Sequence, residues 1–278
     1  MKKTLYISVI ALLTISFNSC SKNDNEGIMN DTPIQFNDPN FLKALLRVVN
    51  EEGMEPMDVD TNRDGQISRK EAAQVKALYI GTSHIRQMDE IKYFTALEYL
   101  YCGGNDIASL DVSNNRALKV LSAEYCNSLT SLNVRNCKVL KKLRCDNFDY
   151  DTDPPYFKQL TSLDISDCVA LEELECQNNK LTSLDLSKNT ALVGLWCWGN
   201  PLTSLDLSKN SALKELGCCG KDNITELDLS KNKKLEFLSV SSDNNLLSIY
   251  LYKYNTIAQQ DMDRLQNNCP NATIYYVE

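Results

Sequence analysis

The 278-residue sequence contains a single histidine, His84. Zinc sites with several histidines, HExxH motifs and paired-histidine catalysis are therefore excluded. Lysine and arginine form no cluster, and 37 acidic against 29 basic side chains give a net charge of −8. Because phosphate binding needs concentrated positive charge, a nucleic-acid partner is excluded as well. Eleven cysteines are present but no CxxC pair, which argues against the metal and redox sites that use this motif.

The N-terminus carries an export signal. Lys2 and Lys3 precede an apolar run over residues 5–17, and Cys20 follows soon after it. The run is too short to span a bilayer. It resembles a bacterial lipoprotein signal, in which residues 1–19 are removed and Cys20 is lipidated; the alternative is a plain signal peptide with an incidental thiol. Residues 20–37 are polar and aperiodic, which predicts a flexible tether.

The acidic start of that tether resembles the surface-export signals of bacterial lipoproteins. We therefore expect a membrane contact through the N-terminal lipid and a location on the outer face of the outer membrane.

A calcium loop is predicted within residues 38–74. Asp38 and Pro39 open an amphipathic helix whose apolar face runs from Phe41 to Val49 and which is expected to stop near Gly53. Residues 60–71, DTNRDGQISRKE, match the EF-hand loop pattern at every specified position. The expected Ca²⁺ ligands are oxygens of Asp60, Asn62, Asp64, Gln66, Ser68 and Glu71. A second helix should run from Ser68 to about Val75.

This loop has no second hand beside it, so we expect a structural site rather than a switch. A polar turn that caps a helix is the alternative reading.

Self-similarity dominates residues 75–256. Residues 171–191, 192–212 and 213–234 align in steps of 21 and 22 residues and match the leucine-rich-repeat pattern LxxLxLxxNxL. The first leucine of each unit falls at Leu97, Leu118, Leu140, Leu171, Leu192, Leu213 and Leu235, and Val75 opens a degenerate earlier unit. Each unit can bury its apolar edge only against its neighbours.

The sequence therefore predicts an α/β solenoid, a right-handed leucine-rich-repeat stack of about eight units made mostly of short parallel strands and coil. A helical EF-hand-type cap is expected at its N-terminal end. A helix and a final strand within residues 257–278 should close the other end.

The sixth position of each unit forms an inward column of small residues: Cys102, Ala123, Cys145, Cys176, Cys197, Cys218 and Val240. Thiols stacked in parallel lie too far apart for relaxed disulfides, so buried free thiols are expected. Cys137 and Cys168 share another position, expected near the surface, and either pair or stay free.

The repeat length, the cysteine column and the LDLSxN returns resemble the internalin-type repeats of bacterial surface proteins, especially their cysteine-ladder subgroup. That resemblance covers residues 38 to about 278 and implies adhesion or partner binding.

Alternation turns the neighbours of the cysteine column outward onto the strand surface. Both tryptophans fall on one unit, beside Gly194 and Gly217. Exposed tryptophans often mark interfaces, although the two rings could instead pack on each other. The candidate ligand-binding residues are Tyr99, Tyr101, Arg144, Glu175, Trp196, Trp198 and, in an insertion between Cys145 and Leu160, Tyr150.

These features favour a monomeric, lipid-anchored, non-enzymatic surface protein that binds a protein or a glycan and holds one structural Ca²⁺. The alternative is a calcium-stabilised extracellular carbohydrate-active enzyme using carboxylates of the insertion, since glycosidases need paired acids but no histidine. Most other aspartates recur in register, as repeat-maintaining residues do: Asp111, Asp164, Asp185, Asp206 and Asp228. A dockerin-like assembly module would need two calcium loops, and the sequence has one.

Overall fold

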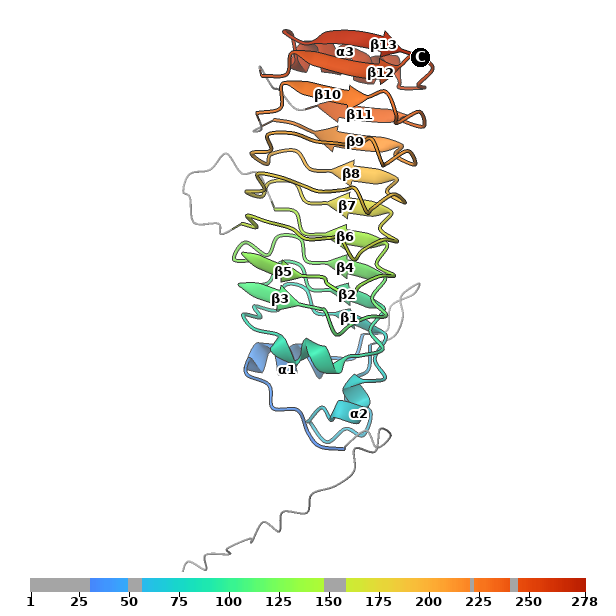
Figure 1. The fold of residues 1–278 in the computed structure, drawn as a ribbon. Coiled ribbons are helices and arrows are strands. Elements are labelled where there is room, and N and C mark those ends of the chain that lie inside the picture. The colour runs from blue at the N-terminus through green and yellow to red at the C-terminus, as the bar shows by residue number, and fades with distance from the viewer. Residues whose placement is uncertain (1–30, 50–56, 148–158, 221–222, 241–244) are drawn as a thin grey trace, which may run out of the picture.

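The computed structural model describes residues 31–49, 57–147, 159–220, 223–240 and 245–278. The chain forms an elongated stack of parallel turns, with the N-terminal segment at one end and the C-terminal strand at the other (Figure 1). The predicted solenoid is therefore confirmed as a parallel β-solenoid with little helix.

One strand from each turn enters an eight-stranded parallel sheet with the order β1-β2-β4-β6-β7-β8-β9-β11. The strands are β1 (Ala77–Tyr79), β2 (Tyr99–Tyr101), β4 (Val120–Ser122), β6 (Lys142–Arg144), β7 (Glu173–Glu175), β8 (Gly194–Trp196), β9 (Glu215–Cys218) and β11 (Phe237–Val240). The central leucine of each strand pairs in register with the next, for example Leu174 with Leu195. This register places equivalent positions of successive repeats side by side.

Shorter sheets and helices complete the stack. A two-stranded sheet joins β3 (Ser109–Asp111) to β5 (Ser131–Asn133), and a three-stranded sheet has the order β10-β12-β13, with β10 at Glu226–Leu229, β12 at Ser248–Tyr252 and β13 at Thr273–Val277. The helices are α1 (Pro39–Leu45), α2 (Arg69–Ala72) and α3 (Gln259–Asn268), with a 3-10 turn η1 at Asp89–Tyr93. Helix α3 and β13 lie at the C-terminal end of the stack, where a helix and a strand were expected (Figure 1).

The core is the continuous apolar column that the repeat pattern predicts. The first leucines of the seven units are fully buried, and the five ladder cysteines are buried and form no disulfide. Burial raises the pKa of the Cys102 and Cys176 thiols well above the ordinary value, so these groups stay protonated. The cysteine column therefore acts as small apolar packing.

Buried asparagines tie consecutive turns together. The Nδ2 group of Asn210 donates to the carbonyls of Leu186 (3.2 Å) and Asn189 (2.9 Å), both in the preceding turn. The Nδ2 group of Asn200 donates to the carbonyl of Cys176 in the preceding turn at 3.0 Å and to the carbonyl of Cys197 in its own turn at 2.9 Å. Because these carbonyls lie in turns away from water, the amide donors remove a desolvation cost that each repeat would otherwise carry.

Three cysteines occupy asparagine positions of these ladders. The Sγ atoms of Cys126, Cys137 and Cys168 contact the backbone carbonyls of Cys102, Val112 and Val134 at 3.5, 3.5 and 3.7 Å. The expectation that Cys137 and Cys168 lie near the surface is wrong, because both are buried and free. Burial raises the pKa of Cys137 to about 11 and that of Cys168 to about 12.

The in-register aspartates close the return turns. Asp185 Oδ1 accepts a hydrogen bond from the backbone N–H of Ser187 at 2.9 Å, and Asp206 Oδ1 accepts one from Ser208 at the same distance. These backbone donors lower the pKa of both carboxyl groups. The periodic aspartates therefore hold turns.

The N-terminal end differs from the prediction in the length of its helices. Asp38 caps α1 as expected, accepting from the Asn40 N–H at 2.8 Å, but α1 ends at Leu45. Val49 instead forms an antiparallel bridge with Met57, and a residue in a bridge cannot continue the helix. Helix α2 is a single turn that ends at Ala72. The helical EF-hand-type cap stays a prediction.

No helix within the described ranges is long and apolar enough to cross a membrane.

Candidate functional site

The predicted calcium loop folds as one tight turn. Gly65 has φ +78° and Arg63 φ +62°, the left-handed region that glycine adopts most easily. The Asp60 carboxylate accepts hydrogen bonds from the N–H groups of Asp64 (3.2 Å) and Gly65 (3.0 Å). The Asn62 amide donates to the Asp64 carboxylate at 3.0 Å. Three of the six predicted ligands therefore surround the same turn.

Glu71, the predicted bidentate ligand, closes the loop from its far end. Its Oε1 accepts from the Thr61 N–H at 3.0 Å, and its Oε2 accepts from the Ser68 N–H at 2.9 Å. Ser68 caps α2 in return, which makes a capping box. Burial raises the pKa of Glu71, but the hydrogen bonds from Ser68 and Thr61 outweigh it and lower the pKa.

An isolated antiparallel bridge between Pro33 and Ser68 lies beside this loop. The Ile34 N–H donates to the Ile67 carbonyl at 2.8 Å, and the Arg69 N–H donates to the Thr32 carbonyl at 3.2 Å. Paired EF-hands exchange strand bonds at the position that Ile67 occupies. Sequence reasoning missed this partner because Thr32–Ile34 lie in the predicted tether and carry no pattern of their own.

The oxygens of the loop are hard donors of the type that Ca²⁺ prefers. Within the part of the chain that is described, however, no three His, Cys, Asp or Glu side chains converge to hold a metal ion. The donor chemistry fits calcium, whereas the arrangement is also complete as a hydrogen-bonded turn.

The neighbours of the cysteine column line up across the eight-stranded sheet. Tyr101, Ser122, Arg144, Glu175, Trp196, Gly217 and Ser239 are consecutive register partners. Backbone hydrogen bonds extend the register beyond the strands, since the Asn147 N–H donates to Gln177 O and the Asn178 N–H to Trp198 O. A second outward column therefore contains Asp146, Gln177 and Trp198. We call the outward side of this sheet the sheet face.

Trp196 lies on a floor made of two glycines. Its Cζ3 and Cη2 atoms are 2.6 and 2.7 Å from the position that a β-carbon would occupy on Gly194. Its Cδ1 is 2.9 Å from the equivalent position on Gly217, one strand away, and Trp198 Cδ1 is 3.4 Å from that position. Both ends of the Trp196 indole thus rest against backbone. The ring lies along the sheet face and remains half-exposed.

Charged side chains border the tryptophans. Arg144 Nε lies 3.1 Å from Glu175 Oε2 in a partly buried ion pair. Asp146 is buried, and this burial raises its pKa to about 6, with Glu175 and Glu124 acting in the same direction and Arg144 against them. The Asp146 Oδ1 and Gln177 Oε1 atoms are buried without a hydrogen-bond partner. Sequence reasoning did not mark Asp146 or Gln177 as candidates.

The remaining candidates are dispersed. The ring of Tyr101 stacks on that of Tyr79 at 5.2 Å between centroids, and Tyr99 is half-buried two residues before it. Both lie at the N-terminal end of the sheet, three or more strands from Trp196. Tyr150 and Cys20 lie outside the described residues.

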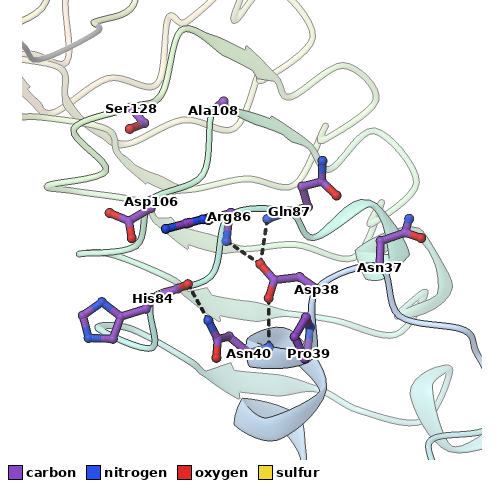
Figure 2. A pocket seen from close by; sticks show the side chains of 10 residues that line it. All are labelled: Asn37, Asp38, Pro39, Asn40, His84, Arg86, Gln87, Asp106, Ala108 and Ser128. Carbon is purple, nitrogen blue, oxygen red and sulfur yellow. Dashed lines mark hydrogen bonds between the residues drawn. The ribbon is translucent and has the colours of Figure 1, made fainter.

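An open groove of about 1050 Å³ lies where the N-terminal segment meets the first turns (Figure 2). Its polar groups serve to join these parts. Asp38 Oδ2 accepts from the Arg86 and Gln87 N–H groups at 2.6 and 3.1 Å, and Asn40 Nδ2 donates to the His84 carbonyl at 2.9 Å. The lone histidine thus contributes its backbone here.

Comparison with known proteins gives structural likenesses only. No family model matches the chain, and no curated protein matches it. The functional domain of InlJ from Listeria monocytogenes, which includes a cysteine ladder, is 27% identical over 90% of this chain and 63% of its own, with a TM-score of 0.49. The present chain thus spans 63% of the length of that domain.

Two further structures are similar to a smaller degree. Internalin C2 from Listeria monocytogenes is 17% identical over 87% of this chain and 94% of its own, with a TM-score of 0.46. A leucine-rich-repeat protein from Leptospira interrogans is 18% identical over 67% and 62%, with a TM-score of 0.34. The strand register and the buried ladders, independently of these likenesses, define the chain as a parallel solenoid.

Proposed function

We propose that the protein is a non-enzymatic, lipid-anchored surface protein that binds a protein or glycan ligand on the sheet face. The observation that supports this function is the position of Trp196, half-exposed on the two-glycine floor. Burying a tryptophan is favourable and exposing one is costly, so an indole held at a sheet surface is typical of contact sites. The sheet face is continuous over eight strands, which suits a macromolecular ligand.

Two further parts belong to the proposal. The lipid on Cys20 would hold the monomeric chain at the outer membrane, with the segment after it as a spacer. One Ca²⁺ at residues 60–71 would stabilise the N-terminal end of the stack. Support for the ion comes from the oxygen-rich turn around Gly65, where Asp60, Asp64 and Glu71 bring three carboxylates into a single loop.

A carbohydrate-active enzyme is the second candidate, and Asp146 is the observation that favours it. A carboxyl group with its pKa raised to about 6 has the property that a general acid needs. Asp146 is also the first acidic residue of the insertion after Cys145. Against this candidate, the five in-register aspartates hold return turns: Asp111, Asp164, Asp185, Asp206 and Asp228.

One experiment distinguishes the binding protein from the carbohydrate-active enzyme. The purified full chain is screened against extracellular glycoproteins and polysaccharides for binding and, in parallel, against glycosidic substrates for turnover. We expect binding without turnover, weakened by roughly 2 kcal/mol in Trp196→Ala and in Trp198→Ala with nearly unchanged melting temperatures. Turnover that is lost in Asp146→Asn would support the enzyme instead. Loss of stability with unaltered binding would show that the tryptophans only pack.

A further inference from the structure

The second outward column brings hydrogen-bond acceptors next to the tryptophans. Asp146, Gln177 and Trp198 occupy successive turns of this column, and Arg144, Glu175 and Trp196 occupy the same turns of the first. Neighbouring strands lie about 4.8 Å apart, so these six residues cover three adjacent rungs of the sheet face. We call them the tryptophan patch. They combine one aromatic rung with two polar rungs.

The polar rungs contain acceptors that lack donors. Asp146 is 3% exposed, and neither its Oδ1 nor the Gln177 Oε1 receives a hydrogen bond. A buried acceptor without a donor costs about 1–3 kcal/mol, which a partner carrying hydroxyl or amide donors would recover. Gln177 is only partly buried, so rotation of its own side chain brings the amide to the surface of the patch.

The charge of the patch narrows the class of partner. Glu124, Asp146 and Glu175 stand together against the single cation Arg144, which is already paired with Glu175. An anionic ligand, such as a sulfated or sialylated chain, would meet like charge. A neutral ligand with many hydroxyl donors would not.

The extent of the aromatic surface argues against a protein ligand at this point. The register partners that flank the patch in the first column are Ser122 on one side and Gly217 followed by Ser239 on the other. A protein interface has a continuous apolar core of several side chains. The tryptophan patch has only one rung with two indoles. This aromatic surface matches the size of one or two sugar rings, whose C–H faces pack on an aromatic plane.

We propose that the tryptophan patch binds a neutral glycan, with sugar rings packed on Trp196 and Trp198 and hydroxyl groups donating to Glu175 and Gln177. This inference rests on the proposed function, because it names the ligand class of the same face. Asp146, on the rung beside Gln177, stays buried and adds to the negative charge of the patch. The Gln177 oxygen then meets a donor, and the glycine floor sets the height of the tryptophan rings.

The chain's only two tryptophans are both in this patch, so intrinsic fluorescence reports on it directly. The purified full chain is titrated with neutral hexose oligosaccharides of increasing length and with sulfated oligosaccharides of matched length. We expect a saturable change in tryptophan emission with a neutral series and a much weaker response to its sulfated counterpart. Calorimetry then measures the variants without depending on the fluorophore.

For the variants we expect the Kd to rise roughly 30-fold in Trp196→Ala and about 5–10-fold in Gln177→Ala. Ser239→Ala, in the same column two strands from Trp196, is the matched control and should leave the Kd unchanged. Gln177→Ala also covers the case in which Trp196→Ala fails to fold. The inference is overturned if no neutral series binds, if the sulfated series binds equally well, or if both patch variants bind like the parent chain.

These failures are distinguishable from failure of the proposed function. A protein ligand that is lost in Trp196→Ala, with no oligosaccharide binding, would overturn the glycan inference and leave the binding function intact. If neither a protein nor a glycan depends on the patch, both are overturned.

Discussion

Trp196 lies over Gly217 on the neighbouring strand, with its Cδ1 2.9 Å from the position of an absent β-carbon. Real β-carbons essentially never approach a ring atom so closely, so the ring can lie down only where that strand carries glycine. Gly194, two residues before Trp196 on its own strand, does the same for the other end of the indole. Two glycines thus decide how the largest side chain of the sheet face is presented.

The first prediction is that Gly217→Ala lifts the indole without unfolding the stack. The added methyl group would overlap Trp196 Cδ1, and the ring is the part free to move because it is half-exposed. We expect tryptophan emission to shift to longer wavelength and the free energy of unfolding to change by less than about 1.5 kcal/mol. Ser239→Ala, one strand further along, should leave the emission unchanged. An unshifted spectrum in Gly217→Ala would mean that the ring does not rest on this floor.

The second prediction concerns the asparagine ladder. Asn210→Ala leaves the carbonyls of Leu186 and Asn189 without their donor inside the stack, which should cost about 2–3 kcal/mol of unfolding free energy. Asn210→Cys should cost less, because cysteines at the equivalent positions 137 and 168 contact the preceding turn through their thiols. Chemical denaturation of the two variants gives the ranking. Equal losses in both would show that the thiol contacts contribute nothing.

The sequence predicts the stack and the faces of its strands because both follow from spacing. A 21-residue period requires neighbouring copies, and alternation about the buried leucines determines which residues point outward, as at Glu175 and Trp196. The same logic failed at Cys137 and Cys168. The sequence predicts surface thiols at these two positions, but both residues stand in the asparagine column, whose members are buried.

The sequence pattern could not show whether an individual side-chain oxygen has a hydrogen-bond donor. Asp146 and Gln177 follow the column pattern like their neighbours, and nothing in the spacing reveals that their oxygens lack donors. Their condition depends on side-chain packing across turns about 31 residues apart. The early end of α1 was likewise hidden, because the bridge between Val49 and Met57 competes with a helical pattern that looks complete locally.

The third prediction uses the raised pKa of Asp146. Its pKa is about 6 in the folded chain against an ordinary value of 3.8, so the folded state favours the protonated form. The raised pKa of Asp146 therefore contributes to the free energy of unfolding below about pH 4, and this contribution is lost as the pH rises through 6. Asp146→Asn should therefore raise the free energy of unfolding by about 1–2 kcal/mol at pH 7.5, allowing for partial solvent screening, and change it little at pH 4.

The control is a substitution at Asp185, which should change the free energy of unfolding in the opposite direction. The backbone N–H of Ser187 lowers the pKa of Asp185, so Asp185→Asn should lower stability at neutral pH and have less effect in acid. Denaturation midpoints of the three chains at both pH values make the comparison. A pH-independent difference between Asp146→Asn and the parent chain would show that Asp146 does not titrate near 6.

The fourth prediction is that Cys20 anchors the chain. Lipidation of this residue should place the protein in the membrane fraction, and Cys20→Ala should release it into the soluble fraction. Ser21→Ala is the matched control and should remain with the membrane. An unchanged membrane fraction in Cys20→Ala would show that the chain is not anchored through Cys20.

The last prediction is that Ca²⁺ stabilises the N-terminal end of the stack without switching its binding activity. Asp60, Asp64 and Glu71 place three carboxylates within residues 60–71, and a bound cation would offset their negative charge. With a Kd of about 10 μM and about 1 mM free calcium, linkage gives roughly 2.7 kcal/mol for the folded loop. In a solenoid this energy acts mainly on the adjoining turns. Chelation should thus loosen residues 57–100 before the central repeats.

Hydrogen exchange with calcium and with a chelator measures this effect, and Glu71→Gln separates the two roles of that residue. Glutamine keeps one acceptor oxygen, which can still accept from the Ser68 N–H of the capping box, but it lacks the second oxygen and the charge of a bidentate calcium ligand. We therefore expect Glu71→Gln to resemble the chelated parent chain in either condition. If the parent chain shows equal protection with and without calcium, the hydrogen bonds of Glu71 alone hold the loop and residues 60–71 are a polar turn that caps α2.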